Sequence, residues 1–433
     1  MNQLTSSKSG SLKGTITVPG DKSISHRSLI MGAMAVGEST VTGLLEGEDV
    51  LGTAAALREL GADIYKDDYG NWHIHGVGIG GLNQPQKPLD MGNSGTGVRL
   101  LMGLVATHPI TATFTGDESL CSRPMKRVTI PLTDFGAQFS GNEVGTLPIT
   151  VKGANMPMPI SYKLPVASAQ VKSAIMLAGL NTPGITTVIE TIPTRDHSER
   201  IFKYFGVPIQ IEGDNIHVTG QVELKARNMA VPADPSSASF LIVAALITEG
   251  SDILISNVGI NPARTGLFKT LIEMGGDIKF ENERQECGED VADIRVKFSN
   301  LKGITVPPER APSMIDEYPI LCIAATCATG KTVMRGIEEL RVKESDRIAI
   351  MVNGLKSCGV TVEEHDDGMT VSNSVAYGNE AIKTSLDHRI AMSFLVLGLC
   401  AEKPVTIDDG SVIETSFPGF VELMNSVGAR IYP

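Results

Sequence analysis

The stretch "GDKSISHR", residues 20–27, places a lysine, an arginine and two serines directly before the apolar run "SLIMGAMAVG". This pattern predicts a buried helix that begins near Lys22, Ser23 and Arg27. The first N–H groups of a helix are unpaired and its dipole is positive there, so this end attracts phosphate and carboxylate groups. Capping alone calls for acceptors, whereas cations oppose the dipole. The two cations therefore indicate a strongly anionic ligand.

Similar polar clusters precede other apolar segments. "SAQVK" and "DHR" again contain cations, whereas "ADPSSAS" has no cation nearby and is explained by capping alone. Further charges in "CSRPMKR", "PTRDHSER" and "RVKESDR" could be ordinary solvated helix charges. In "RVKESDR", however, Lys343 and Arg347 are four residues apart, which predicts one helix face that presents both cations, with Glu344 beside them, to one ligand.

Asp316 and Glu317 stand just ahead of a deeply apolar segment, where a carboxylate could have a raised pKa and act as a general base. Motifs for other chemistries fail. "ATGKT" lacks the first glycine of a P-loop, and "GNSGTG" has the wrong spacing for a dinucleotide fingerprint. "DHSE" and "DHR" lack the HExxH metal spacing, and no GxSxG elbow is present. We therefore expect no nucleotide, no metal and no acyl-enzyme chemistry.

Composition describes an ordinary soluble globular protein. The chain has 433 residues, 42% hydrophobic and 20% charged, which is long for a single core and favours two domains. A net charge of −12 argues against nucleic acid as the main partner. The longest apolar stretch, around 391–401, is too short to span a bilayer, and the first residues show no signal-peptide pattern. Six cysteines form no CxxC motif. We expect a reduced, cytoplasmic and monomeric protein with no membrane partner.

One landmark recurs six times along the chain: a glycine after an amphipathic helix, followed by a predicted strand. These are Gly61, Gly136, Gly206, Gly275, Gly359 and Gly428. Glycine there supplies the left-handed helix cap. About 40 residues ahead of each lies a polar cluster with an apolar helix, and a β-rich stretch follows that helix. Each repeat is predicted as helix, strand, helix, strand, with the first helix buried and the second covering a sheet.

The six repeats divide into two groups of three. We predict an α/β fold with two similar lobes, an N-terminal lobe of residues 20–233 and a discontinuous C-terminal lobe of residues 1–19 plus 234–433. The chain would cross between them near Pro19–Gly20, a predicted hinge, and near Ala233–Asp234. The strand "GSLKGTITVPG" could belong with either lobe. A single large α/β domain with coincidental spacing is the alternative.

With these residues in view, the chain resembles the 5-enolpyruvylshikimate-3-phosphate synthase family over essentially its whole length. The motifs that carry the resemblance are "PGDKSISHR", "GNSGTGVR", "SRPM", "SAQVKSA", "RVKESDR" and "DHRIAMSF". The resemblance implies the enolpyruvyl transferase fold, two lobes each of three βαβαββ repeats. It also implies transfer of the enolpyruvyl (1-carboxyvinyl) group of phosphoenolpyruvate to the 5-hydroxyl of shikimate 3-phosphate. That reaction releases phosphate, belongs to chorismate and aromatic amino acid biosynthesis, and uses no metal and no organic cofactor.

The resemblance also implies residue roles. The N-terminal lobe would hold shikimate 3-phosphate, and the C-terminal lobe would bring phosphoenolpyruvate and the catalytic carboxylates. Residues implied for shikimate 3-phosphate are Lys22, Ser23, Arg27, Ser168, Ala169, Gln170, Arg195, Asp316 and Lys343. Residues implied for phosphoenolpyruvate are Lys22, Gly95, Arg123, Gln170, Arg347, His388 and Arg389. Asp316 would take the 5-hydroxyl proton, and Glu344 with Lys22 would protonate the methylene carbon. His26 is interpreted as a structural or supporting residue.

General physics fits these roles. Two highly charged anions can be held within reacting distance only by many fixed cations. A pair of carboxylates then supplies the base and the acid for addition and elimination through a tetrahedral intermediate. Because the implied ligands come from both lobes, closure is expected to follow binding.

Within the family, "GDKS", "RDHSE" and "SAQVK" match the second class, which is associated with tolerance to the inhibitor glyphosate. Ala263 replaces the threonine of a further marker, Asn-x-Thr-Arg. Thr415 stands at about the place of a lysine in the first class, so we assign no cation there. Gly95, rather than alanine, leaves tolerance open. Reduced sensitivity is the hypothesis.

Two rival functions stay open at this point. The sister enzyme that transfers enolpyruvyl to UDP-N-acetylglucosamine shares the fold and uses a loop cysteine, and Cys121 falls in a comparable loop, although within the "SRPM" context. A non-catalytic protein that binds phospho-ligands on the same repeats would need neither Asp316 nor Glu344.

Overall fold

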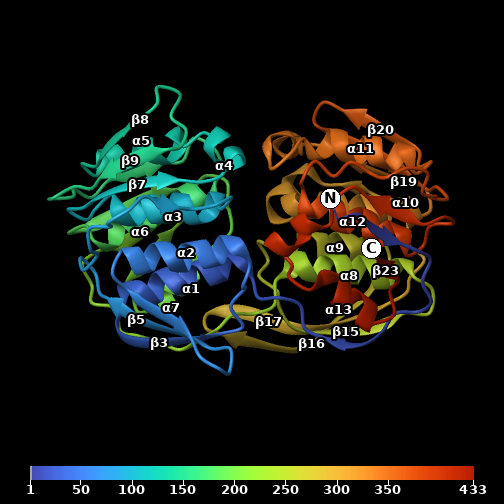
Figure 1. The fold of residues 1–433 in the computed structure, drawn as a ribbon, viewed down its shortest axis with the longest axis horizontal. Coiled ribbons are helices and arrows are strands. Elements are labelled where there is room, and N and C mark those ends of the chain that lie inside the picture. Colours follow the sequence, from blue (N-terminus) through green and yellow to red (C-terminus); the bar gives the residue numbers. More distant parts are fainter. Residues whose placement is uncertain (1) are drawn as a thin grey trace. The chain divides into compact units, whose positions relative to one another are not determined.

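The computed structural model describes residues 2–433. Contacts group the chain into two compact lobes (Figure 1). The N-terminal lobe is Gly20–Val231 with Glu286–Glu289, and the C-terminal lobe is the chain up to Pro19 with Pro232–Gln285 and Asp290–Pro433. Each lobe has its own hydrophobic core. The sequence-based prediction placed Glu286–Glu289, the tip of a hairpin, in the C-terminal lobe, whereas its contacts group it with the N-terminal lobe.

Three repeats make up the N-terminal lobe. The first contains α1 (Lys22–Met34), β3 (Val36–Thr42), α2 (Glu48–Glu59), β4 (Asp63–Lys66), β5 (Trp72–Val77) and the later strand β14 (Met229–Ala230). The second contains β6 (Leu89–Asp90), α3 (Gly95–Val105), β7 (Thr111–Thr115), α4 (Glu118–Ser122), α5 (Lys126–Asp134), β8 (Gln138–Gly141) and β9 (Ile149–Lys152). The third contains β10 (Ser161–Lys163), α6 (Ala169–Leu180), β11 (Ile185–Ile189), α7 (His197–Tyr204), β12 (Ile209–Glu212) and β13 (Asn215–Thr219).

The C-terminal lobe repeats the plan. The fourth repeat contains β2 (Lys13–Ile16), α8 (Pro235–Ile247), β15 (Asp252–Gly259), α9 (Gly266–Glu273), β16 (Asp277–Glu286) and β17 (Glu289–Lys297). The fifth contains β18 (Thr305–Val306), the 3-10 turns η1 (Pro308–Ser313) and η2 (Ile315–Glu317), α10 (Tyr318–Cys327), β19 (Lys331–Met334), η3 (Glu338–Val342), α11 (Arg347–Ser357), β20 (Val362–His365) and β21 (Gly368–Ser372). The sixth contains α12 (His388–Gly398), β22 (Val405–Ile407), η4 (Ser411–Thr415), α13 (Phe420–Ser426), β23 (Ile431–Tyr432) and β1 (Leu4–Ser6).

Five four-stranded sheets share one topology, shown by the order β6-β7-β9-β8. In that sheet β6 runs parallel to β7, and β9 and β8 continue it antiparallel. The residue pattern predicted one strand after each second helix, and this was wrong for these five repeats, because a hairpin of two strands follows. The βαβαββ plan implied by the family resemblance includes that strand.

The N-terminal segment completes two repeats of the C-terminal lobe. Strand β2 pairs in parallel with β15, which settles the lobe to which "GSLKGTITVPG" belongs. Strand β1 lies between β22 and β23 and is antiparallel to both, so it takes the place that a hairpin strand fills in the other sheets.

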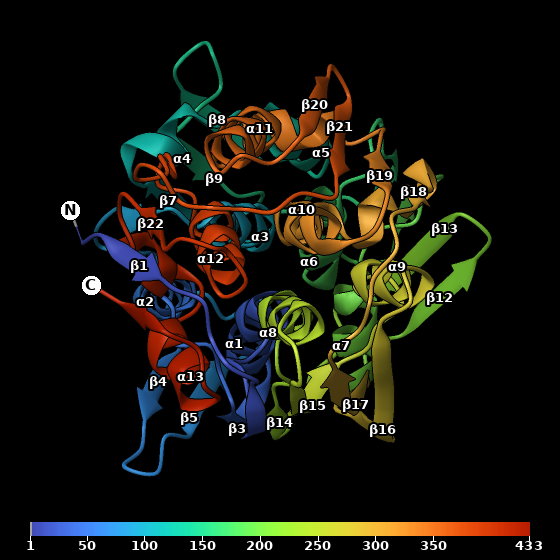
Figure 2. The ribbon, with the colours of Figure 1, turned by 90° about the vertical axis from the view of Figure 1, so that its right-hand side faces the viewer.

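The first helix of each repeat is buried, as its apolar composition predicted. In α8 every residue is buried, and in α1 burial is continuous from Ile24 to Met34. Figure 2 looks nearly along α8, α10 and α12, which lie together at the centre of the C-terminal lobe, with α9, α11 and α13 farther out. No helix within residues 2–433 is both long and apolar enough to cross a membrane.

All six landmark glycines have left-handed backbone, with φ between 76° and 109°. Each directly follows the C-cap residue of the second helix of its repeat, which is the amphipathic one. The prediction of six glycine caps is therefore confirmed. Gly206 isolates the backbone effect, because a Cβ there would meet nothing within 4 Å.

We predict opposite effects for two alanine substitutions of open glycines. Gly206→Ala should lower the free energy of unfolding by about 1 kcal/mol, because alanine resists φ of +86°. Gly52→Ala, inside α2 and also without a neighbour within 4 Å, should raise it by about 0.5 to 1 kcal/mol. Urea unfolding of both variants measures the difference, and equal effects would contradict the cap.

Candidate active site

In the N-terminal lobe, helix beginnings gather around Arg27. Its side chain is buried, and Nε and Nη2 donate to the hydroxyls of Ser198 (2.8 Å) and Ser173 (2.7 Å), while Nη1 donates to the Ser23 carbonyl (2.9 Å). These bonds join the starts of α1, α6 and α7. Burial, only partly offset by Glu199, lowers the pKa of Arg27 to about 10, so the side chain remains a cation at neutral pH.

Lys22, the first residue of α1, forms an ion pair with Asp49 of α2. Asp21, rather than either cation, caps the helix by accepting from the Ile24 N–H at 2.9 Å. Asp49 was not singled out from the sequence. It holds the ammonium at the mouth of the helix, with the Lys22 side chain 30% exposed and therefore reachable by a ligand.

Gly95 begins α3, where two arginines approach its backbone. A Cβ on Gly95 would lie 2.9 Å from Nη1 of Arg99 and 3.1 Å from Nη1 of Arg123. Arg123 is oriented by Asn93, which accepts from Nη2 at 2.6 Å. The glycine therefore makes room for two guanidinium groups side by side.

Arg99 is the functional candidate that sequence reasoning missed here. It is buried, donates to Gln170 Oε1 (2.8 Å) and to the Gly95 carbonyl (2.9 Å), and its buried Nε has no hydrogen-bond partner among residues 2–433. Burial and the neighbouring Arg127 and Arg123 lower its pKa to about 9. A cation inside the apolar run "GVRLLMGLV" was the available signal.

Ser168, Ala169 and Gln170 stand at the beginning of α6. Ser168 caps the helix by accepting from the Val171 N–H. The Gln170 side chain is fixed from α3, since Thr96 accepts from its Nε2 at 3.0 Å while Arg99 donates to its oxygen. Arg195 lies partly buried just ahead of α7, the helix that provides Ser198 to Arg27.

His26 is fully buried and supports the site rather than facing it, in line with its interpretation as a structural residue. Its Nδ1 hydrogen-bonds with Thr53 Oγ1 at 2.8 Å, linking α1 to α2. Burial lowers the pKa of His26 to about 3, so the ring is neutral at pH 7.

In the C-terminal lobe, Arg347 is the centre of the polar cluster. It is 1% exposed, and three carboxylates surround it: Asp387 at 2.8 Å, Glu344 at 2.6 Å and Asp316 at 3.3 Å. Burial lowers the pKa of Arg347, but the three carboxylates more than offset this and raise it above its usual value. The starts of α10, α11 and α12 therefore meet at one guanidinium group.

Asp387 is a further residue that sequence reasoning left without a role. It is fully buried, accepts from Arg347 and from Ser345 Oγ (3.0 Å), and caps α12 through the Arg389 N–H (3.0 Å). The arginine that follows in "DHR" donates from Nη1 to the Asp316 carbonyl at 3.3 Å and lies 3.5 Å from Glu317.

Glu344 is ionised in this arrangement. Partial burial raises the pKa of its carboxyl, but Arg347 and then His388 outweigh burial and hold the pKa below its usual range. The side chain is 34% exposed, so a substrate can reach it. Asp316, whose side chain is 18% exposed, shares the same arginine and is likewise accessible.

Lys343 and Arg347 do not share a helix face, and that prediction was wrong. Asp346 accepts from the Ala349 N–H and starts α11 at Arg347, while Lys343 directly follows the preceding turn η3. The ammonium of Lys343 instead pairs with Glu339 at 2.6 Å. Glu344 and Arg347 do meet, as an ion pair three residues apart.

A second correction concerns "ADPSSAS". Asp234 caps α8 as predicted, but the expected absence of a nearby cation was wrong, because Arg264 donates to Asp234 (3.0 Å) and to Ser236 (2.9 Å). Arg264 belongs to "NPAR", 30 residues further along the chain, so local spacing could not reveal the contact.

Each lobe thus offers distinct chemistry. The N-terminal lobe presents cations, hydroxyls and helix beginnings, which suit phosphate and carboxylate groups. The C-terminal lobe presents two accessible carboxylates beside buried and partly buried cations, which suits proton transfer next to an anion. No group of three or more His, Cys, Asp or Glu side chains within residues 2–433 has metal-site geometry.

Solved structures with this architecture include an enolpyruvyl transferase. NikO from Streptomyces tendae matches with a TM-score of 0.78 at 17% identity, covering 99% of this chain and 98% of that one, which establishes the fold. An EPSP synthase from Acinetobacter baumannii matches with a TM-score of 0.92 at 46% identity over 100% of both chains. The class of protein is therefore that of the two-lobed enolpyruvyl transferases.

The family model for EPSP synthase (3-phosphoshikimate 1-carboxyvinyltransferase) matches residues 6–424. A protein of that name from Parvibaculum lavamentivorans is 60% identical over 99% of this chain and 96% of its own length. One from Cereibacter sphaeroides is 59% identical over 99% of this chain and 97% of its own. This chain belongs to the EPSP synthase family.

We predict a pH-dependent stability that originates at His26. An unfolded histidine binds a proton below about pH 6.5, whereas folded His26 resists protonation down to about pH 3. The unfolded state therefore binds more protons between these values, and stability falls as the pH is lowered. From pH 6 to pH 4.5 the wild type should lose about 2 kcal/mol more than His26→Gln in urea unfolding. Parallel losses in both proteins would contradict the assignment.

Proposed function

We propose that this protein transfers the enolpyruvyl group of phosphoenolpyruvate to the 5-hydroxyl of shikimate 3-phosphate and releases phosphate. Membership of the EPSP synthase family supports the reaction class, and the names of relatives about 60% identical support the substrates. The observation that carries the chemistry is the cluster around Arg347, where Asp316 and Glu344 stand as accessible carboxylates beside one buried cation.

Asp316 is the proposed base. It would remove the proton of the 5-hydroxyl while that oxygen bonds to C2 of phosphoenolpyruvate. The methylene carbon takes a proton in the same addition, which gives a tetrahedral intermediate. Elimination then removes a proton from the methyl group and expels phosphate, which restores the double bond. Arg347 and Arg389 border the carboxylate and so suit the anionic second substrate.

Glu344, together with Lys22, is the proposed acid. The carboxyl group of Glu344 is ionised in the structure, which limits when it can act. Because Arg347 favours the ionised carboxylate, Glu344 must gain a proton before it can give one. An anionic substrate bound to Arg347 would weaken that pairing and favour protonation of Glu344. The acid is therefore formed in the substrate complex rather than in the free protein.

The shikimate phosphate is assigned to Ser23, Arg27, Ser168, Ala169, Gln170 and Arg195, with Lys343 as a further contact. Phosphoenolpyruvate is assigned to Lys22, Gly95, Arg123, Gln170, Arg347, His388 and Arg389. Arg99 joins this second set, since it holds Gln170 and lies beside Gly95. Fixed cations offset the mutual repulsion of the two anions.

The test is phosphate release from shikimate 3-phosphate and phosphoenolpyruvate. Wild type should turn over, and Asp316→Ala should bind both ligands in calorimetry while kcat falls by about 10²- to 10⁴-fold. Asp252→Ala, which breaks a surface pair with Arg295 in the same lobe, is the matched control and should keep full activity.

Three results would contradict the proposal. No release by wild type favours a binding protein, release with UDP-N-acetylglucosamine in place of shikimate 3-phosphate favours the sister enzyme, and full activity of Asp316→Ala refutes the base.

We also propose that the chain is of the second, glyphosate-tolerant class. The markers "GDKS", "RDHSE" and "SAQVK" support this assignment. Ala263 leaves Arg264 in place, because the turn is held by Asn261, whose side chain accepts from the Ala263 N–H at 2.9 Å. Thr415 donates to the Val412 carbonyl at 2.7 Å within η4 and supplies no cation.

We predict reduced glyphosate sensitivity, and competitive inhibition against phosphoenolpyruvate at low micromolar glyphosate would contradict it.

Gly95→Ala should raise the KM for phosphoenolpyruvate about tenfold, because its Cβ would crowd Arg99 and Arg123. Gly52→Ala, in open space, is the control and should leave that KM unchanged. Steady-state kinetics with glyphosate titration measure both effects.

A further inference from the structure

Behind the residues assigned to shikimate 3-phosphate lies a fully buried lysine. Lys172, in the first turn of α6, is 0% exposed and meets two carboxylates, with Nζ 2.9 Å from Glu190 Oε2 and 2.7 Å from Glu199 Oε1. A buried charge is strongly unfavourable unless it is paired, and a cation at this end of a helix also opposes the dipole. None of the three residues has a role in the chemistry above.

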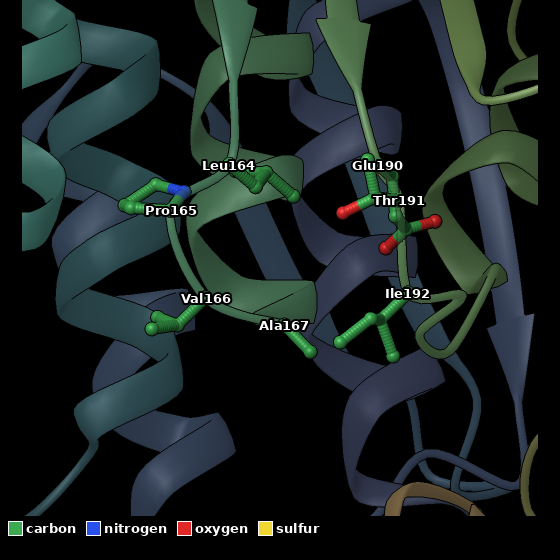
Figure 3. Close-up of a pocket in the computed structure, with 7 residues that line it drawn as sticks. All are labelled: Leu164, Pro165, Val166, Ala167, Glu190, Thr191 and Ile192. Carbon is green, nitrogen blue, oxygen red and sulfur yellow. The ribbon is translucent and has the colours of Figure 1, made fainter.

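Glu190 ties this lysine to the segment that leads to Arg195. Glu190 follows the end of β11, and its other carboxylate oxygen, Oε1, accepts from the backbone N–H of Thr194 at 3.1 Å and from the Thr194 hydroxyl. The carboxylate thus closes the turn 190–194 immediately before Arg195. Figure 3 shows Glu190–Ile192, the first part of this turn, beside Leu164–Ala167, the residues that lead into Ser168; both stretches line one pocket.

Glu199 ties the same lysine to the other side of Arg195. It lies in the first turn of α7, whose N-cap residue Asp196 follows Arg195 directly and pairs with Arg200 at 2.9 Å. Oε2 of Glu199 is buried and has no hydrogen-bond partner within residues 2–433, while Oε1 pairs with the Lys172 ammonium, which helps to hold the side chain in place. Arg195 therefore stands between two anchors that converge on one ammonium group.

Helix α6 provides the reference point for these anchors. Ser168 caps this helix, Gln170 lies in its first turn, and Ser173, the neighbour of Lys172, accepts from Arg27 at 2.7 Å. A lysine fixed to this helix therefore sets the Arg195 segment against the other residues assigned to the same ligand. An apolar side chain would fill the space at lower desolvation cost, which points to positioning rather than stability.

We propose that the buried trio Lys172, Glu190 and Glu199 positions Arg195 for the phosphate-bearing substrate. The inference rests on the proposed function, in which Arg195 contacts shikimate 3-phosphate. The three are positioning residues, since they act through Arg195 and through helix α6.

Glu190→Gln tests the proposal, because the amide keeps the shape but must turn its NH2 group toward either the Lys172 ammonium or the Thr194 N–H, both of which are donors. The KM for shikimate 3-phosphate should rise about tenfold, whereas kcat and the KM for phosphoenolpyruvate should stay within about twofold of wild type. Glu212→Gln, an exposed glutamate on β12, is the matched control and should change none of these values.

A double-mutant cycle separates positioning from general weakening. In an Arg195→Ala background, Glu190→Gln should cause no further loss of shikimate 3-phosphate affinity, because the residue that it positions is gone. Equal effects in both backgrounds, an unchanged KM, or a uniform fall of all kinetic values would overturn the proposal. If Glu190→Gln fails to fold, Thr194→Val removes only the hydroxyl contact, and a smaller rise in the same KM is expected.

Calorimetric titration with shikimate 3-phosphate alone repeats the cycle without turnover. If wild type binds this ligand but releases no phosphate, the proposed function fails while the positioning test still applies. If wild type does not bind the ligand, both proposals are overturned.

Discussion

Burial of a positive charge at the start of a helix is the constraint around which the C-terminal lobe is arranged. Arg347 is almost fully enclosed at the beginning of α11, where the helix dipole opposes it. Asp387, Glu344 and Asp316 neutralise it, and each comes from a different segment. Removing one partner of such a buried pair typically lowers the free energy of unfolding by about 3 to 5 kcal/mol. The three segments that carry these carboxylates are therefore held close together around Arg347. The carboxylates available for proton transfer are thus the counter-charges of this arginine.

The N-terminal lobe buries its arginines differently. Arg27 donates to two serine hydroxyls and a carbonyl, and Arg99 donates to an amide and a carbonyl, so neutral acceptors take the place of carboxylates. Burial, which Glu199 offsets only in part at Arg27, therefore lowers the pKa values of Arg27 and Arg99 to about 10 and 9. An anionic ligand would supply the missing charge. The contrast matches the proposed division of labour, anion binding in one lobe and acid–base chemistry in the other.

Much of the framework could be predicted from residue patterns, because the determining interactions are local. A glycine after a helix is needed wherever the chain turns through positive φ, and all six do so. Helices that are apolar on every side have to be buried, and they are. The hairpin strand missing from the predicted repeat is a different case. Strands β8 and β12 directly follow landmark glycines and were expected, whereas β9 and β13 come after a further turn and have no landmark of their own.

Residue patterns were enough to predict the six-fold repeat and the buried helices, and motifs that resemble a known family gave the residues assigned to the substrates. Which charges meet became visible only in the folded protein. Arg264 pairs with Asp234, Lys172 with Glu190 and Glu199, and Arg347 with Asp387, whereas Lys343 turns to Glu339. Strand β1 likewise joins the last sheet, some 400 residues away. The physical reason is that a counter-charge acts across space, so a spacing along the chain reveals it only where both residues share one regular element.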